Sequence, residues 1–186
     1  MQLGFVQILP EDEATARHTS RDHMYRDHVI IAPRHLEQLQ VYAAAQGLQI
    51  RGVQADAREL PFEDDSFDVV IMTQALQAVH YPDRVIDDML RVGKECIITF
   101  PNFGYWRCRV YLMTKGRMPV SKLLPYTWYN TPNIHLCTFK DFEALCAEHN
   151  IKVLNRIMVG NDNSESWLAD RWPNLFGVTA IYHISK

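Results

Sequence analysis

Hydrophobic and polar positions along the chain predict strands separated by helices. Residues 67–72 read FDVVIM, a nearly continuous apolar run that is typical of a strand buried on both faces. A helix is expected next, because Pro82 and Asp83 suit a first turn and Gly93 suits an end after an apolar stripe. Residues 96–100 form a second apolar run. The centre of the chain is therefore predicted to be strand, helix, strand.

The same alternation extends toward both ends of the chain. Further strand patterns lie at residues 4–9, 29–31, 49–55, 151–159 and 177–184. Gly47 is placed to end a helix between two of them. Thr138 and Asp141 resemble a capping box that opens a helix ending at Asn150. Strands alternating with helices imply an α/β fold with a doubly wound, mostly parallel sheet, in which ligands bind beyond the carboxyl ends of the strands.

The length and charge of the chain limit the number of domains and the kinds of partner that are expected. The 186 residues suit a single domain over 1–186. With 22 acidic and 19 basic residues, the formal charge of −3 offers no basic surface for phosphate contacts, so nucleic acid is not an expected partner.

The cysteines and the apolar runs point to a reduced compartment. The four cysteines form no CxxC pair, so buried, reduced thiols are expected and a zinc ribbon is not. The first residues lack a basic region ahead of an apolar core, and no apolar run is long enough to span a bilayer. A cytoplasmic protein without membrane attachment is predicted.

The run AQGLQIRGVQADARELPFEDDSFDVVI, residues 45–71, resembles the class I S-adenosylmethionine-dependent methyltransferases. The resemblance implies a Rossmann-like sheet and makes S-adenosylmethionine a candidate cofactor. It matches the Asp56-Ala57 pair to the position where a carboxylate accepts a hydrogen bond from the adenine amino group. Gln74, just after the fourth strand, would face the same cleft; a capping or solvent contact is the alternative role for this side chain.

From residue 66 onward a narrower resemblance emerges. The runs SFDVVIMTQALQAVHYPDRVIDDMLRVGKECIITFPNFGYWRCR and GRMPVSKLLPYTWYNTPNIH look like the MetW family of methionine biosynthesis. That family is associated with homoserine O-acyltransfer, so the resemblance implies an accessory protein that supports homoserine O-acyltransferase. The alternative function is a methyltransferase that acts on a small molecule.

The first half of the cofactor site departs from the methyltransferase pattern. The first predicted strand, 4–9, runs into Pro10-Glu11-Asp12-Glu13 instead of a glycine-rich loop, and Ile30 stands where an acid would bind the ribose. A hydrogen bond to a charged group contributes about 1.5–3 kcal/mol. Losing the carboxylate and the loop contacts would remove roughly 4–6 of the about 8 kcal/mol that hold a micromolar ligand. Millimolar or weaker binding is the prediction.

Residues 1–27 are therefore treated as an atypical N-terminal segment. Two explanations stay open. The chain is a cofactor-free relative, or its first residues are not the family's own, through a frameshift, a fusion or an alternative start.

Residues 102–137 form a long, aromatic-rich insertion before the last predicted helix. Its candidate partner or substrate residues are Tyr105, Trp106, Tyr126, Trp128, Tyr129, Asn130 and His135. Part of the segment is expected to pack internally, because Phe103, Trp106, Val110 and Met113 have the spacing of one buried helical stripe. Tyrosine, tryptophan and arginine are enriched at interface hot spots. A partner surface or lid, plain packing and a small-substrate pocket remain the alternatives.

Histidines offer weaker candidates for chemistry. His80 has a side chain able to act as a base, and Tyr81 adjoins it, but an exposed loop histidine is the favoured interpretation and no catalytic residue is assigned. His18, His23 and His28 are spaced by five, which does not align ligands on one helix face, so no metal site is predicted.

Overall fold

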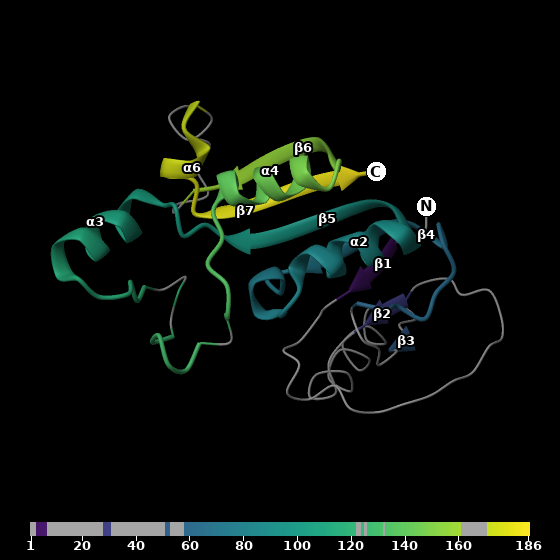
Figure 1. The fold of residues 1–186 in the computed structure, drawn as a ribbon, viewed down its shortest axis with the longest axis horizontal. Coiled ribbons are helices and arrows are strands. Elements are labelled where there is room, and N and C mark those ends of the chain that lie inside the picture. Colours follow the sequence, from purple (N-terminus) through teal and green to yellow (C-terminus); the bar gives the residue numbers. More distant parts are fainter. Residues whose placement is uncertain are drawn as a thin grey trace, which may run out of the picture.

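The strands of the computed structural model form one sheet (Figure 1). The structure describes residues 3–6, 28–30, 51–52, 58–121, 124, 126–131, 133–160 and 171–186. The strands are β1 (Leu3–Val6), β2 (His28–Ile30), β3 (Arg51–Gly52), β4 (Phe67–Thr73), β5 (Gly93–Pro101), β6 (Lys152–Val159) and β7 (Thr179–Ser185). Their order is β3-β2-β1-β4-β5-β7-β6, with β1 to β5 parallel and β7 antiparallel to both of its neighbours.

This arrangement confirms the predicted α/β fold with a mostly parallel sheet. The helices are α2 (Pro82–Val92), α3 (Trp106–Lys115), α4 (Phe139–Glu148) and the short α6 (Pro173–Phe176), with a 3₁₀ turn, η2 (Leu76–Ala78). The helix expected before Gly47 lies outside the described residues. No helix among the described residues is long and apolar enough to cross a membrane.

The core lies on one face of the sheet. Alternate residues of β4, β5 and β7 are fully buried there: Val70, Met72, Cys96, Ile98, Ala180, Tyr182 and Ile184. They share one face because Val70 lies opposite Cys96, which in turn lies opposite Ile184. Helices α2 and α4 add buried side chains to the same cluster. The rings of Phe142 and Tyr182 are 4.5 Å apart between their centroids, which ties α4 to β7.

The ends of α2 and α4 follow the sequence signals. In α2, Pro82 occupies the first turn, where its missing N–H is not needed. Gly93 ends the helix beside β4, and a Cβ there would lie only 2.5 Å from Val70 Cγ2. In α4, the Thr138 hydroxyl accepts from the Asp141 N–H and the Asp141 carboxylate accepts from the Thr138 N–H, so the predicted capping box is confirmed.

Candidate functional site

The carboxyl ends of the parallel strands meet at one edge of the sheet, where a ligand is expected. Gln74 lies at this edge, directly after β4, with left-handed backbone (φ 55°) and an exposed side chain. Its N–H donates to the Thr99 carbonyl at 2.9 Å and to the Thr99 hydroxyl at 3.1 Å. The backbone of Gln74 is thus fixed against β5, and its side chain is free to contact a ligand.

Gln77 holds the end of the aromatic-rich segment against this edge. It is 1% exposed, and its Nε2 donates to the Pro101 carbonyl at 3.0 Å and the Cys137 carbonyl at 3.4 Å. Its carbonyl accepts from the N–H groups of Ile134 and His135 at 2.8 and 3.0 Å. Its Oε1 is buried without a hydrogen-bond partner among the described residues. Sequence reasoning missed Gln77, although it is the one amide within the apolar run 75–79.

Asn102 is a second buried amide that sequence reasoning missed. Its Nδ2 donates to the Gly177 carbonyl at 2.7 Å and the Asn174 carbonyl at 3.3 Å, and its Oδ1 accepts from the Gly104 N–H at 2.8 Å. A Cβ on Gly104 would lie 2.8 Å from the Asn174 carbonyl oxygen. The signal was present as two similar strings, PNFG at 101–104 and PNLFG at 173–177, which the fold brings together.

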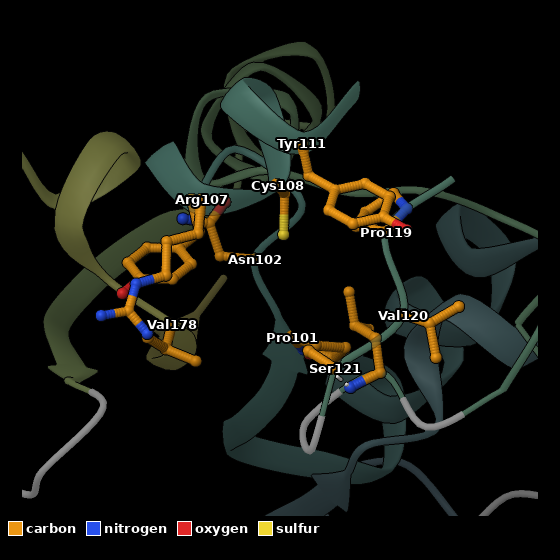
Figure 2. Close-up of a pocket in the computed structure, with 11 residues that line it drawn as sticks. Pro101, Asn102, Arg107, Cys108, Tyr111, Pro119, Val120, Ser121 and Val178 are labelled. Carbon is orange, nitrogen blue, oxygen red and sulfur yellow. Dashed lines mark hydrogen bonds between the residues drawn. The ribbon is translucent and has the colours of Figure 1, made fainter. Parts of the chain in front are cut away.

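A cavity of about 490 Å³ opens beyond the carboxyl end of β5 (Figure 2). Pro101 and Asn102, at the strand end, lie on one side of it. Helix α3 contributes Cys108 and Tyr111 to the lining, and the chain after α3 contributes Pro119, which lies beside the Tyr111 ring. The lining is largely apolar.

Helix α3 projects from the rest of the described chain (Figure 1). None of its side chains is buried; Met113 is 79% exposed and Val110 is 42% exposed. The predicted buried stripe of Phe103, Trp106, Val110 and Met113 is therefore wrong. The spacing correctly predicts a helix, which ends at the left-handed Gly116 (φ 58°), but the helix does not lie on the core.

The predicted aromatic residues separate into two groups. Tyr105 is half-buried and lines the cavity, with its ring 6.0 Å from that of Trp106. The exposed group is Tyr126, Trp128 and Tyr129, at 50%, 75% and 72% exposure.

Asn130 and His135 have structural contacts. The Asn130 Oδ1 accepts from the N–H and hydroxyl of Thr127, both at 2.8 Å, which closes the turn that carries Trp128 and Tyr129. His135 Nε2 lies 3.2 Å from the His80 carbonyl oxygen, so two histidines distant in the sequence meet.

By the methyltransferase resemblance, the other side of the cofactor cleft is expected at the carboxyl ends of β1 and β2 and near the Asp56-Ala57 pair. Asp56 and Ala57 lie outside the described residues. At the carboxyl ends of β1 and β2, Val6 pairs with Ile30, so β2 ends in an apolar residue where a ribose would need an acid. No glycine occurs in the sequence between Gly4 and Gly47. Neither of these two strand ends therefore carries an acid for the ribose.

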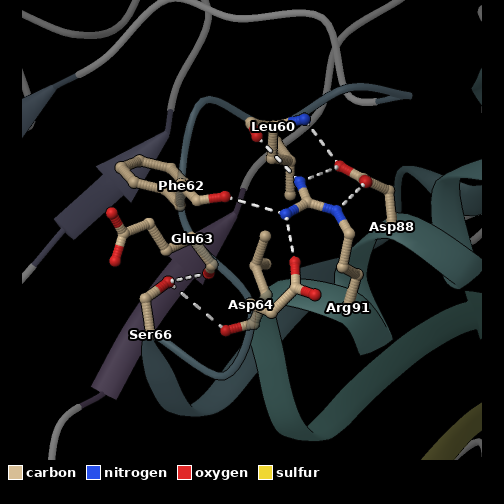
Figure 3. A network of polar contacts seen from close by, with 8 residues as sticks. Leu60, Phe62, Glu63, Asp64, Ser66, Asp88 and Arg91 are labelled. Carbon is tan, nitrogen blue, oxygen red and sulfur yellow. Dashed lines mark hydrogen bonds and ion pairs between the residues drawn. The ribbon is translucent and has the colours of Figure 1, made fainter. Parts of the chain in front are cut away.

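Arg91 fixes the loop that follows the Asp56-Ala57 pair (Figure 3). From α2, its guanidinium donates to the Leu60 and Phe62 carbonyls at 2.9 and 2.8 Å. It also pairs with Asp88 at 2.6 Å and with Asp64 at 2.9 Å. The hydrogen bonds that Arg91 donates to Asp88, and then the one to Asp64, raise the pKa of Arg91 further above its ordinary value. The loop is thus held to α2 by charged hydrogen bonds.

His80 and Tyr81 lie directly before α2. His80 is exposed, and the ring of Tyr81 lies under the guanidinium groups of Arg84 and Arg58, at 5.1 and 5.8 Å from the ring centroid. Within the described ranges, no group of three or more histidine, cysteine or acidic side chains is placed to hold a metal ion. His18 and His23 lie outside those ranges.

Solved structures show the same fold. The [4+2]-cyclase SpnF covers 100% of this chain with a TM-score of 0.61 at 19% identity, and the chain covers 75% of it. A possible histamine N-methyltransferase from Thermotoga maritima, described as S-adenosylmethionine-dependent, covers 86% with a TM-score of 0.54 at 16% identity; the chain covers 72% of it. The fold is that of class I methyltransferases.

Sequence comparison identifies the family. A bifunctional methionine biosynthesis protein MetXA/MetW from Rhodopirellula baltica is 36% identical over 121 residues, which cover 64% of this chain. This chain spans about a fifth of that relative (19%). Residues 24–184 match the family described as methionine biosynthesis protein MetW. Because the match extends over most of the sequence, this chain belongs to the MetW family.

Proposed function

We propose that the chain is an accessory protein of methionine biosynthesis that binds and supports a homoserine O-acyltransferase. The observation that carries the proposal is an exposed apolar surface on the family's long insertion. We call it the α3 surface, and its residues are Trp106, Val110 and Met113, which recur at helical spacing on α3. The exposed Trp128 and Tyr129 belong to the same insertion.

The stability of a helix with so little buried surface has to be explained. An isolated helix of ten residues is marginal in water, because most helical stability in proteins comes from burying an apolar face. Contiguous exposed apolar side chains on a soluble protein mark interaction sites. Tyrosine and tryptophan are also the residues that interfaces favour at their hot spots. A protein partner that covers the α3 surface accounts for both features.

The Rhodopirellula relative supports the choice of partner. Its name places MetXA and MetW in one bifunctional protein. Linking two modules in one chain raises the effective concentration of each for the other, which benefits proteins that work in contact. An acyltransferase of the MetX type is accordingly the partner that we propose.

The test is co-purification with the acyltransferase from the same organism. We expect the Val110→Lys/Met113→Lys variant, and separately Trp128→Ala/Tyr129→Ala, to weaken the association more than tenfold, since about 1.4 kcal/mol suffices. Ile157→Lys is the matched control, because Ile157 is an exposed apolar residue (52%) on β6 rather than on the insertion. Unchanged co-purification of both double variants would refute the proposed surface.

A small-molecule methyltransferase is the second candidate, because the matched fold is that of methyltransferases and Gln74 presents an exposed amide at the carboxyl edge. Titration calorimetry with S-adenosylmethionine and S-adenosylhomocysteine separates the two. Micromolar affinity for either ligand, weakened by Asp56→Ala, would support the methyltransferase function. No heat up to millimolar ligand, with no thermal stabilisation, is the outcome expected for a scaffold.

A further inference from the structure

The cavity beyond β5 has the dimensions and position of a ligand site. Its volume of about 490 Å³ lies inside the range of roughly 300–1,000 Å³ that small-molecule pockets occupy. It opens at the carboxyl end of a parallel strand, which is where open α/β sheets bind ligands. Its residues come from the end of β5, from α3 and the segments that flank it, and from Val178.

Apolar groups form most of the cavity surface. Pro101, Val120, Leu124 and Val178 are among the lining residues. The Cys108 Sγ points into the central space (Figure 2). Burial raises the pKa of the Cys108 thiol, which agrees with an apolar setting. A ligand that fits this lining has an apolar body.

The lining of the cavity includes one charged side chain. Arg107 is the charged residue of the lining, and no carboxylate lines the cavity. Its guanidinium lies 5.4 Å from the centroid of the Trp106 ring, and no ion pair of Arg107 occurs among the described residues. The hydroxyls of Tyr105 and Tyr111 also lack hydrogen-bond partners within the described part of the chain.

We infer that this cavity binds a small molecule with an apolar body and one carboxylate, which Arg107 recognises. The amide of Asn102 is not the recognising group, because both of its polar atoms are occupied by Gly104, Asn174 and Gly177. This inference does not depend on an acyltransferase partner, since the cavity is complete within one chain.

The probes are 4-phenylbutyrate and its uncharged counterpart 4-phenylbutanol, titrated into the full-length chain. Binding is measured by calorimetry, and its location by protection of Cys108 from iodoacetamide, read by peptide mass spectrometry. We expect the carboxylate to protect Cys108 and to bind about fivefold more tightly than the alcohol, as for one partly solvated ion pair.

Variants test which residue recognises the carboxylate and whether the probes bind in the cavity. Arg107→Gln should remove the fivefold advantage of the carboxylate. Arg117→Gln is the matched control, because Arg117 lies on the same segment but does not line the cavity, and it should change nothing. Cys108→Phe fills the central space and should abolish binding of both probes.

Two results would overturn the inference. Absence of both binding heat and Cys108 protection would show that the cavity takes no such ligand. Equal affinity for the two probes, or an equal loss in Arg107→Gln and Arg117→Gln, would show that Arg107 does not recognise a carboxylate. Neither result bears on co-purification with the acyltransferase, so the two proposals fail independently.

Discussion

At the scale of single residues, Arg91 has the largest set of charged contacts among the described side chains. Its guanidinium makes five hydrogen bonds, which join α2 to the loop before β4. Two of the acceptors are the carbonyls of Leu60 and Phe62, and the Leu60 carbonyl also accepts from the Phe62 N–H at 2.8 Å. The loop conformation therefore depends on one side chain.

We expect Arg91→Ala to lower the free energy of unfolding by about 1.5–3 kcal/mol, because it removes five hydrogen bonds of a charged group, while Asp88 keeps only the hydrogen bond from the Leu60 N–H. Urea denaturation measures this. Lys94→Ala is the control, since Lys94 and Asp68 form an exposed pair whose contribution to stability is expected to be small. Equal effects of the two substitutions would contradict the importance given to the Arg91 contacts.

Residue roles were predictable where they depend on local sequence and unpredictable where they depend on distant neighbours. Thr138 and Asp141 cap a helix through contacts three residues apart, and the spacing alone predicts that. The buried amides of Gln77 and Asn102 bond to carbonyls 24 to 75 residues away. Nothing in the local pattern distinguishes such an amide from an exposed one, so both were missed.

At the scale of elements, α3 and α4 show what an apolar stripe does and does not predict. Both were expected helices with an apolar face. In α4, Phe139, Phe142 and Cys146 are buried in the core. In α3 no side chain is buried. Periodicity indicates that a helix has an apolar face, but it does not indicate whether that face meets the chain's own core or another molecule.

The capping box of α4 gives a prediction at this scale. Thr138→Ala removes the hydroxyl that accepts from the Asp141 N–H and should destabilise the protein by about 1 kcal/mol in thermal or urea unfolding. Thr138→Ser keeps the hydroxyl and should retain most of the stability. If Ser and Ala destabilise equally, the cap is not what stabilises the start of α4.

At the scale of the whole molecule, three thiols make the free energy of unfolding depend on pH in the alkaline range. Burial raises the pKa of Cys96 and Cys137 to about 12 and that of Cys146 to about 11. The ordinary value is 9.0, so above it the unfolded chain loses these protons while the folded chain keeps them. The stabilisation is complete below that value and is lost as the pH rises toward the folded-state values.

We therefore expect the free energy of unfolding to fall between about pH 8 and pH 10, by about 1 kcal/mol for each buried thiol. Cys96→Ala should make the fall shallower by that amount, although it also lowers stability at every pH by leaving a cavity. Urea unfolding of both proteins at the two pH values tests this. An unchanged slope in the variant would argue against Cys96 as a contributor.

The order of the strands in the sheet could not be predicted from the hydrophobic periodicity of the sequence. Alternating strands and helices predict a doubly wound sheet, and the resemblance to methyltransferases specifies its type. The strand pattern of 177–184 carries no sign that this segment lies between β5 and β6, because an apolar strand has the same appearance at any central position. The candidate cavity was unpredictable for a similar reason: its walls meet only after β5, α3 and residue Val178 are assembled.

The position of β7 between β5 and β6 also determines the order in which strand pairs can form. β5 cannot acquire its second neighbour until residues 179–185 have been synthesised and have returned across the sheet. β6 pairs only with β7 among the described strands, so it waits as well. Pairings between such distant segments form slowly, and the open edge of β5 is meanwhile able to pair with other chains. During synthesis, the chain therefore passes through an aggregation-prone intermediate, which ends when β7 pairs with β5.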